Sequence, residues 1–170
     1  MVEIKSLILA IICFFTQEQI PVISTDVTLF LDVTEKIIII EQHNLSTIKE
    51  EEQNAIKGLK AVENKTDLVA SMQNVTLISK EIFVKNNELN AKIKLSYTSI
   101  KDIADLGFSL NTDGTYSYFK SNTIELLTDN GIEKEDEFIF KADKNIKFKV
   151  TPKLYKDVKL ISLAPAWSVK

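Results

Sequence analysis

The stretch Glu88–Thr98, ELNAKIKLSYT, decides the fold class of this 170-residue chain, because its side chains alternate between apolar and polar. Successive side chains of a β-strand point to opposite sides, so such alternation is typical of a strand with one buried and one solvated face. The apolar face is expected to hold Leu89, Ala91, Ile93, Leu95 and Tyr97. The stretch therefore predicts a half-buried strand of an antiparallel sheet.

Further strands are expected on both sides of this stretch. The segment Lys85–Glu88, KNNE, predicts a tight hairpin turn, because asparagine tolerates the left-handed backbone conformation. The dipeptide Asp113-Gly114 is itself a strong signal of a second hairpin turn. A run of β-branched residues, Ile37–Ile40, is consistent with a strand buried on both faces. The other predicted strands are residues 27–33, 75–84, 137–141, 146–150 and 158–163.

One main helix is predicted within residues 47–64, TIKEEEQNAIKGLKAVEN. Thr47 and Glu50 fit a capping box, and Ile48, Ala55, Leu59 and Val62 fall on one helical stripe. A short helical turn capped by Ser99 is also expected. The order of elements predicts an α+β fold, in which an antiparallel β-sheet of about eight hairpin-linked strands carries this helix on one face.

The apolar run Ser6–Gln17, SLILAIICFFTQ, predicts the destination of the chain. It is shorter than the roughly 20 residues of a transmembrane helix, and it matches the apolar region of a secretory signal. Val22-Ile23-Ser24 provides a small-residue cleavage site. We therefore expect a cleaved signal peptide at residues 1–24, no transmembrane segment in the mature chain, and one exported domain at residues 25–170, periplasmic or extracellular. The alternative is a buried N-terminal element of a cytosolic domain.

Composition excludes several classes of function. Cleavage near Ser24 would leave no cysteine, which excludes disulfides, thiol nucleophiles and zinc–thiolate sites. The net charge is −3 and the chain has no arginine, so we expect no nucleic-acid partner. Lipid anchoring through Cys13 is not expected, because Ile12 occupies the place where a lipobox needs a small residue. We expect no cofactor.

Catalytic residues are hard to find in this sequence. His43 is the single histidine, and no partner motif accompanies it. The acidic segment around Asn130-Gly131 fails as an EF-hand, because Leu126 would occupy a position that needs a carboxylate. We therefore expect a protein that is not an enzyme, with a hydrolase using His43 or acidic residues as an alternative.

Charge is distributed unevenly along the chain. Residues 25–137 contain 12 lysines and 20 acidic residues, a net charge of −8, whereas residues 138–170 contain 8 lysines and 2 acidic residues, a net charge of +6. Lys147 and Lys149 alternate with apolar residues and are expected on one sheet face, and Lys144 could extend the patch. Such a patch predicts contact with anionic lipid headgroups or an envelope surface. The alternative is that these lysines only solvate and protect a strand edge.

Two segments carry a resemblance: residues 87–108, NELNAKIKLSYTSIKDIADLGF, and residues 111–119, NTDGTYSYF. Together with the N-terminal hairpin and the helix, they resemble uncharacterised small exported proteins of AT-rich Bacteroidota. The element order is also similar to LppM-type envelope lipoprotein domains, although the lipobox is missing. The resemblance implies a lipid-related role and assigns no functional residue. The expected function is a non-catalytic exported binding or interaction module at the cell envelope, with a purely structural secreted protein as a further alternative.

Overall fold

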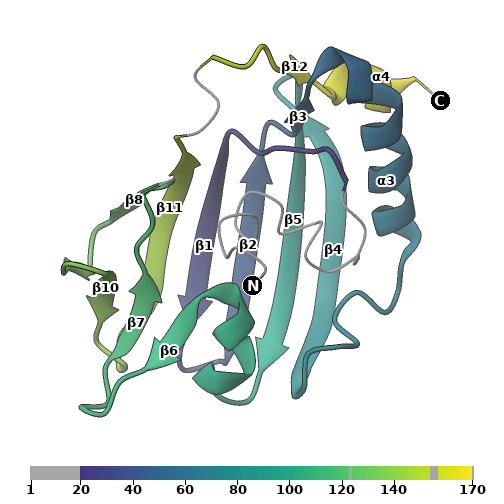
Figure 1. Cartoon of the computed structure of the whole chain (residues 1–170). Helices are drawn as coiled ribbons and strands as arrows, with labels where there is room; N and C mark the ends of the chain where they lie inside the picture. The colour runs from purple at the N-terminus through teal and green to yellow at the C-terminus, as the bar shows by residue number, and fades with distance from the viewer. Residues whose placement is uncertain (1–19, 123, 154–156, 170) are drawn as a thin grey trace.

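A six-stranded antiparallel sheet forms the centre of the computed structural model, which describes residues 20–122, 124–153 and 157–169 (Figure 1). Its strands run in the order β4-β5-β2-β1-β11-β8. Their bounds are β4 Val75–Lys85, β5 Glu88–Tyr97, β2 Ile37–His43, β1 Asp26–Asp32, β11 Ile146–Pro152 and β8 Ile124–Thr128.

Two smaller sheets complete the β-structure of the described residues. A four-stranded sheet runs in the order β6-β7-β10-β9, and β12 pairs with β3. The bounds are β6 Phe108–Leu110, β7 Tyr116–Phe119, β10 Glu137–Phe140, β9 Ile132–Glu133, β12 Ile161–Ser162 and β3 Ser46–Thr47. The predicted α+β class is confirmed, but the strands number twelve among the described residues, because β3, β8 and β9 form in segments where no strand was predicted.

Residues 88–97 form β5 as predicted, and the five apolar side chains of its alternating face are all buried. The prediction that Ile37–Ile40 is buried on both faces was wrong. Ile38 and Ile40 are buried, whereas Ile37 and Ile39 are partly exposed on the opposite side. The reason is that packing elements cover one side of the sheet only, so even a continuous apolar run alternates in burial.

The main helix, α3 (Glu52–Asn64), packs on the side of the sheet that we call the inner face. Its buried residues are Ala55, Leu59 and Val62, as the predicted stripe required, but Ile48, the fourth residue of that stripe, lies before the helix and is exposed. Lys80 of β4 anchors the C-terminal end of the helix, because its Nζ donates hydrogen bonds to the carbonyl oxygens of Val62 and Lys65. Figure 1 shows α3 running beside β4.

The predicted capping box of Thr47 and Glu50 does not form. A 3-10 turn, η1 (Lys49–Glu51), precedes α3. No side chain forms a capping hydrogen bond at the N-terminus of η1 or of α3. Thr47 lies in β3, and its hydroxyl donates to the carbonyl of Pro21 instead. A capping box does form at η2 (Ile100–Leu106), where Ser99 and Asp102 bond to each other's backbone, as the expected Ser99 cap suggested.

Aromatic side chains connect the four-stranded sheet to the inner face. The ring of Phe148 in β11 lies 4.5 Å from that of Tyr118 and 6.1 Å from those of Phe108 and Phe140. All four residues are almost fully buried. The inner face is therefore part of the core, and its opposite side, which we call the outer face, is left to solvent.

The N-terminal segment that leads into β1 is also part of the fold. Ile20, Val22 and Ser24 are buried, and Ile23 pairs with Ser46 of β3. The expected signal sequence Ser6–Gln17 lies outside the described residues.

None of the helices within the described ranges is long and apolar enough to cross a membrane. The short C-terminal helix α4 (Ala164–Ser168) packs near α3.

Candidate binding surface on the outer sheet face

Four strands place two lysines and two apolar side chains in one line across the outer face. The strand register pairs Lys94 with Ile39, Ile39 with Phe30, and Phe30 with Lys147. Directly paired residues of an antiparallel sheet project to the same side, and neighbouring strands lie about 4.8 Å apart. The two lysine backbones are therefore about 14 Å apart, three strand spacings. We call these four residues the lysine–apolar row.

The lysine–apolar row contains no carboxylate. Lys147 is exposed, while Lys94, Ile39 and Phe30 are partly exposed. Neither Lys94 nor Lys147 forms an ion pair with another described residue. The row thus offers an apolar centre between two cations whose charges have no partner in the described structure.

The neighbouring row on the same face is different, because its charges are paired. Lys92 Nζ lies 2.7 Å from Glu41 Oε1, and Lys149 Nζ lies 3.4 Å from Asp26 Oδ2. The hydrogen bond from Lys92 lowers the pKa of Glu41, and the same bond raises the pKa of Lys92. This row is close to neutral, so it contributes little attraction for an anion.

The structure separates the three lysines that the sequence predicted as one patch. Lys147 and Lys149 both project from the outer face, as the alternation predicted, but Asp26 neutralises Lys149. Lys144 lies exposed in the turn before β11, where its backbone N–H donates to the carbonyl of Lys141. Edge protection does not explain Lys147 and Lys149, because β11 pairs with β1 on one side and β8 on the other.

Sequence reasoning missed Lys94, Phe30 and Ile39 as members of this surface. The alternation of each strand did indicate that Lys94 and Phe30 point away from the core. Their alignment with Lys147 depends on the register of β1, β2, β5 and β11, however, and no single-strand pattern contains that register.

His43 does not have the geometry of a catalytic relay. Its Nε2 atom lies 3.9 Å from Asp26 Oδ1 and 3.4 Å from Thr28 Oγ1. In a Ser-His-Asp arrangement one ring nitrogen faces the nucleophile and the other faces the carboxylate. Here a single nitrogen faces both groups. The described part of the chain also holds no group of three His, Cys, Asp or Glu side chains that could bind a metal ion.

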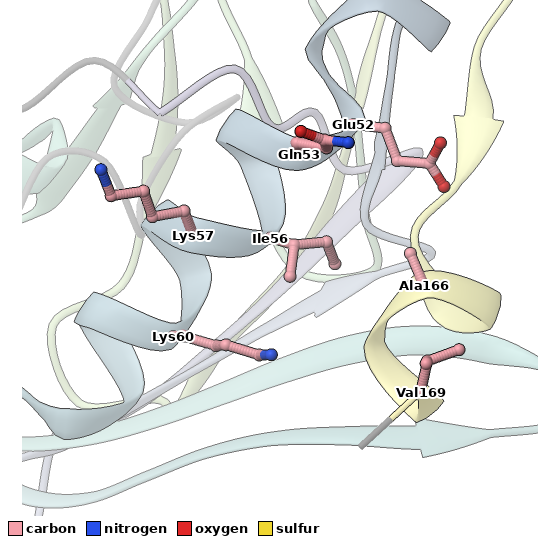
Figure 2. A pocket seen from close by; sticks show the side chains of 7 residues that line it. All are labelled: Glu52, Gln53, Ile56, Lys57, Lys60, Ala166 and Val169. Atoms are coloured by element: carbon pink, nitrogen blue, oxygen red, sulfur yellow. The ribbon is translucent and has the colours of Figure 1, made fainter.

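A hollow lies between α3 and α4 and has a volume of about 560 Å³ (Figure 2). Ile56, Ala166 and Val169 make much of its lining apolar. Lys60 extends from α3 toward α4, whereas Lys57 points away. The hollow is open to solvent, and Lys60 and Val169 are exposed, so it lacks the buried converging polar groups of a specific small-molecule site.

Comparisons of the chain with family models, with curated proteins and with solved structures found no match. The resemblance to small exported proteins and to LppM-type domains therefore stays a prediction. The lysine–apolar row is the feature of the described structure on which a functional proposal can be built.

Proposed function

We propose that this protein is an exported, non-catalytic binding module that meets anionic lipid headgroups of the cell envelope with its outer sheet face. The observation that carries the proposal is the lysine–apolar row, in which Lys94 and Lys147 flank Ile39 and Phe30 and form no ion pair with another described residue. The export step rests on the apolar run Ser6–Gln17.

The chemistry of the row suits the boundary between lipid headgroups and water. A lysine near an anionic membrane contributes about 1 kcal/mol of binding free energy. Apolar and aromatic side chains between such lysines gain further free energy by entering the region just below the headgroups. The packing of α3 and the four-stranded sheet on the inner face leaves the outer face available for such a contact.

Sedimentation with vesicles of mixed zwitterionic and anionic lipid tests this proposal. Lys147→Gln and Lys94→Gln should each weaken binding about fivefold, since each removes about 1 kcal/mol of attraction. Lys149→Gln combined with Asp26→Asn removes a neutral ion pair without changing the net charge, so this double substitution should have a smaller effect. Binding should fall steeply as salt rises, because screening shortens the reach of the charges to about 8 Å at physiological ionic strength.

Two controls separate a specific surface from general attraction. Lys101→Gln makes the same change of net charge at an exposed position of η2, outside the six-stranded sheet, and should leave binding nearly unchanged. His43→Ala should also have no effect. If wild-type protein does not sediment with anionic vesicles at low salt, or if Lys101→Gln weakens binding as much as Lys147→Gln, the proposal is wrong.

A further inference from the structure

The segment Ile20–Ser24, which we call the N-terminal strap, is packed as tightly as the core. Figure 1 shows it crossing from α3 over one end of the large sheet to β1. Ile20 and Val22 are 8% and 6% exposed, and Ser24 is fully buried. Ile20 lies against Gly58 of α3, where a Cβ atom would be 2.6 Å from Ile20 Cγ2. The helix thus has a glycine at the point where the strap crosses it.

Hydrogen bonds hold the strap along its length. The backbones of Ile23 and Ser46 bond to each other in both directions at 2.8 Å, and Thr47 donates its hydroxyl hydrogen to the carbonyl of Pro21. Gln42 Nε2 donates to Ser24 Oγ at 3.1 Å. Gln42 is only 2% exposed, and its Oε1 has no partner among the described residues, so loss of Ser24 would leave the whole buried amide unpaired.

These contacts conflict with a mature chain that begins at Thr25. Cleavage after Ser24 would remove two core side chains, uncover Gly58 and Gln42, and leave β3 without its contact to Ile23. We infer that the strap stays in the mature protein, and that removal of the leader leaves Ile20 and the residues after it in place. The inference takes from the proposed function only the export step.

The N-terminus of the exported protein gives the direct test. The full chain is produced with its own leader in a bacterial host, and the intact mass of the folded, purified protein is measured. We expect a chain that begins at Ile20 or earlier. A folded protein that begins at Thr25 would overturn the inference. Vesicle binding is measured separately, so failure of the lipid proposal and failure of this inference are distinguishable.

Hydrogen exchange on the same protein tests the packing of the strap independently of export. The amides of Ile23 and Thr25 donate to the carbonyls of Ser46 and His43, and they should exchange as slowly as amides of β1 and β2. Fast exchange at both amides in the wild-type protein would contradict the inference.

Two variants test whether the contacts of Ile20 with Gly58 and of Thr47 with Pro21 are the reason that the strap amides exchange slowly. Gly58→Leu should displace Ile20 and speed exchange of the strap amides by about tenfold or more, whereas Ala61→Leu, at an exposed position of α3, should not. Thr47→Val keeps the shape of its side chain, removes the bond to Pro21 and should loosen the strap without enlarging any residue. Unchanged exchange in both Gly58→Leu and Thr47→Val would show that these contacts do not hold the strap.

Discussion

Lys80 and Lys147 show how the same residue type acquires different roles from its surroundings. The Lys80 side chain reaches two carbonyl oxygens at the end of α3, and burial lowers its pKa. A cation at a helix C-terminus is favourable because the carbonyl ends of the helix carry partial negative charge. Lys147 projects into solvent from the outer face and has no such partner among the described residues. Lys80 therefore connects β4 to the end of α3, whereas Lys147 makes no ion pair with another described residue.

Tyr97 should make the protein less stable at high pH. Burial, with smaller contributions from Tyr116 and Asp32, raises the pKa of its phenol from 10.0 to about 12. Between these values the unfolded chain loses the proton while the folded chain keeps it, so the free energy of unfolding falls. The stabilisation is complete below pH 10 and is lost as pH rises toward 12, at up to about 1.4 kcal/mol per pH unit.

Urea unfolding of wild type and Tyr97→Phe over this alkaline range measures the effect. The unfolding free energy of the variant should fall less steeply with pH than that of wild type. At neutral pH, the difference between the two proteins measures the contribution of the hydrogen bond from the Tyr97 hydroxyl to the backbone carbonyl of Asp32. Tyr118 is also buried with a raised pKa, so some alkaline loss should remain in the variant. Parallel curves for the two proteins would show that Tyr97 does not titrate differently on folding.

The hairpin between β4 and β5 depends on its two-residue turn. Asn86 and Asn87 have φ angles of 54° and 63°, the left-handed conformation that a type I′ turn requires at both central positions. Asn87→Val should destabilise the protein by about 1–2 kcal/mol, because asparagine tolerates the left-handed conformation whereas a β-branched side chain is strained in it. Asn87→Gly should be neutral or stabilising. Equal effects of the two substitutions in urea unfolding would show that turn conformation does not limit stability.

The whole molecule depends on the contact between its two larger sheets. Phe148 lies on the inner face and touches aromatic rings from β6, β7 and β10. Phe148→Ala should cost about 3–5 kcal/mol, because it opens a cavity where the sheets meet. Leu127→Ala, on the outer face and 57% exposed, should change stability by no more than about 0.5 kcal/mol.

Hydrogen exchange can show whether this contact makes the two sheets unfold together. In Phe148→Ala the amides of β7 and β10 should exchange faster than those of β2 and β5, because the four-stranded sheet loses much of its attachment. A uniform loss of protection would instead mean that other contacts keep the sheets cooperative.

The sequence by itself determined the class of the fold and the orientation of its strongest elements. The alternation in β5 identified its buried face, the stripe of α3 identified the helix side that packs, and Ser99 identified the start of η2. These features are local, because side-chain direction repeats every two residues in a strand and every 3.6 in a helix. The repeat of side-chain direction was therefore enough to predict the buried faces of β5 and α3, and the hydroxyl of Ser99 was enough to predict the cap of η2.

Only the tertiary structure decided which of these elements meet. Thr47 bonds to the carbonyl of Pro21 and does not cap the helix. Ile37 and Ile39 are partly exposed because other elements pack on one side of the sheet only. The tertiary structure also aligned Lys94 with Lys147 across four strands and paired Lys149 with Asp26. The physical reason is that strand register and side-chain pairing are set by contacts between distant segments, whose free energies no local pattern contains.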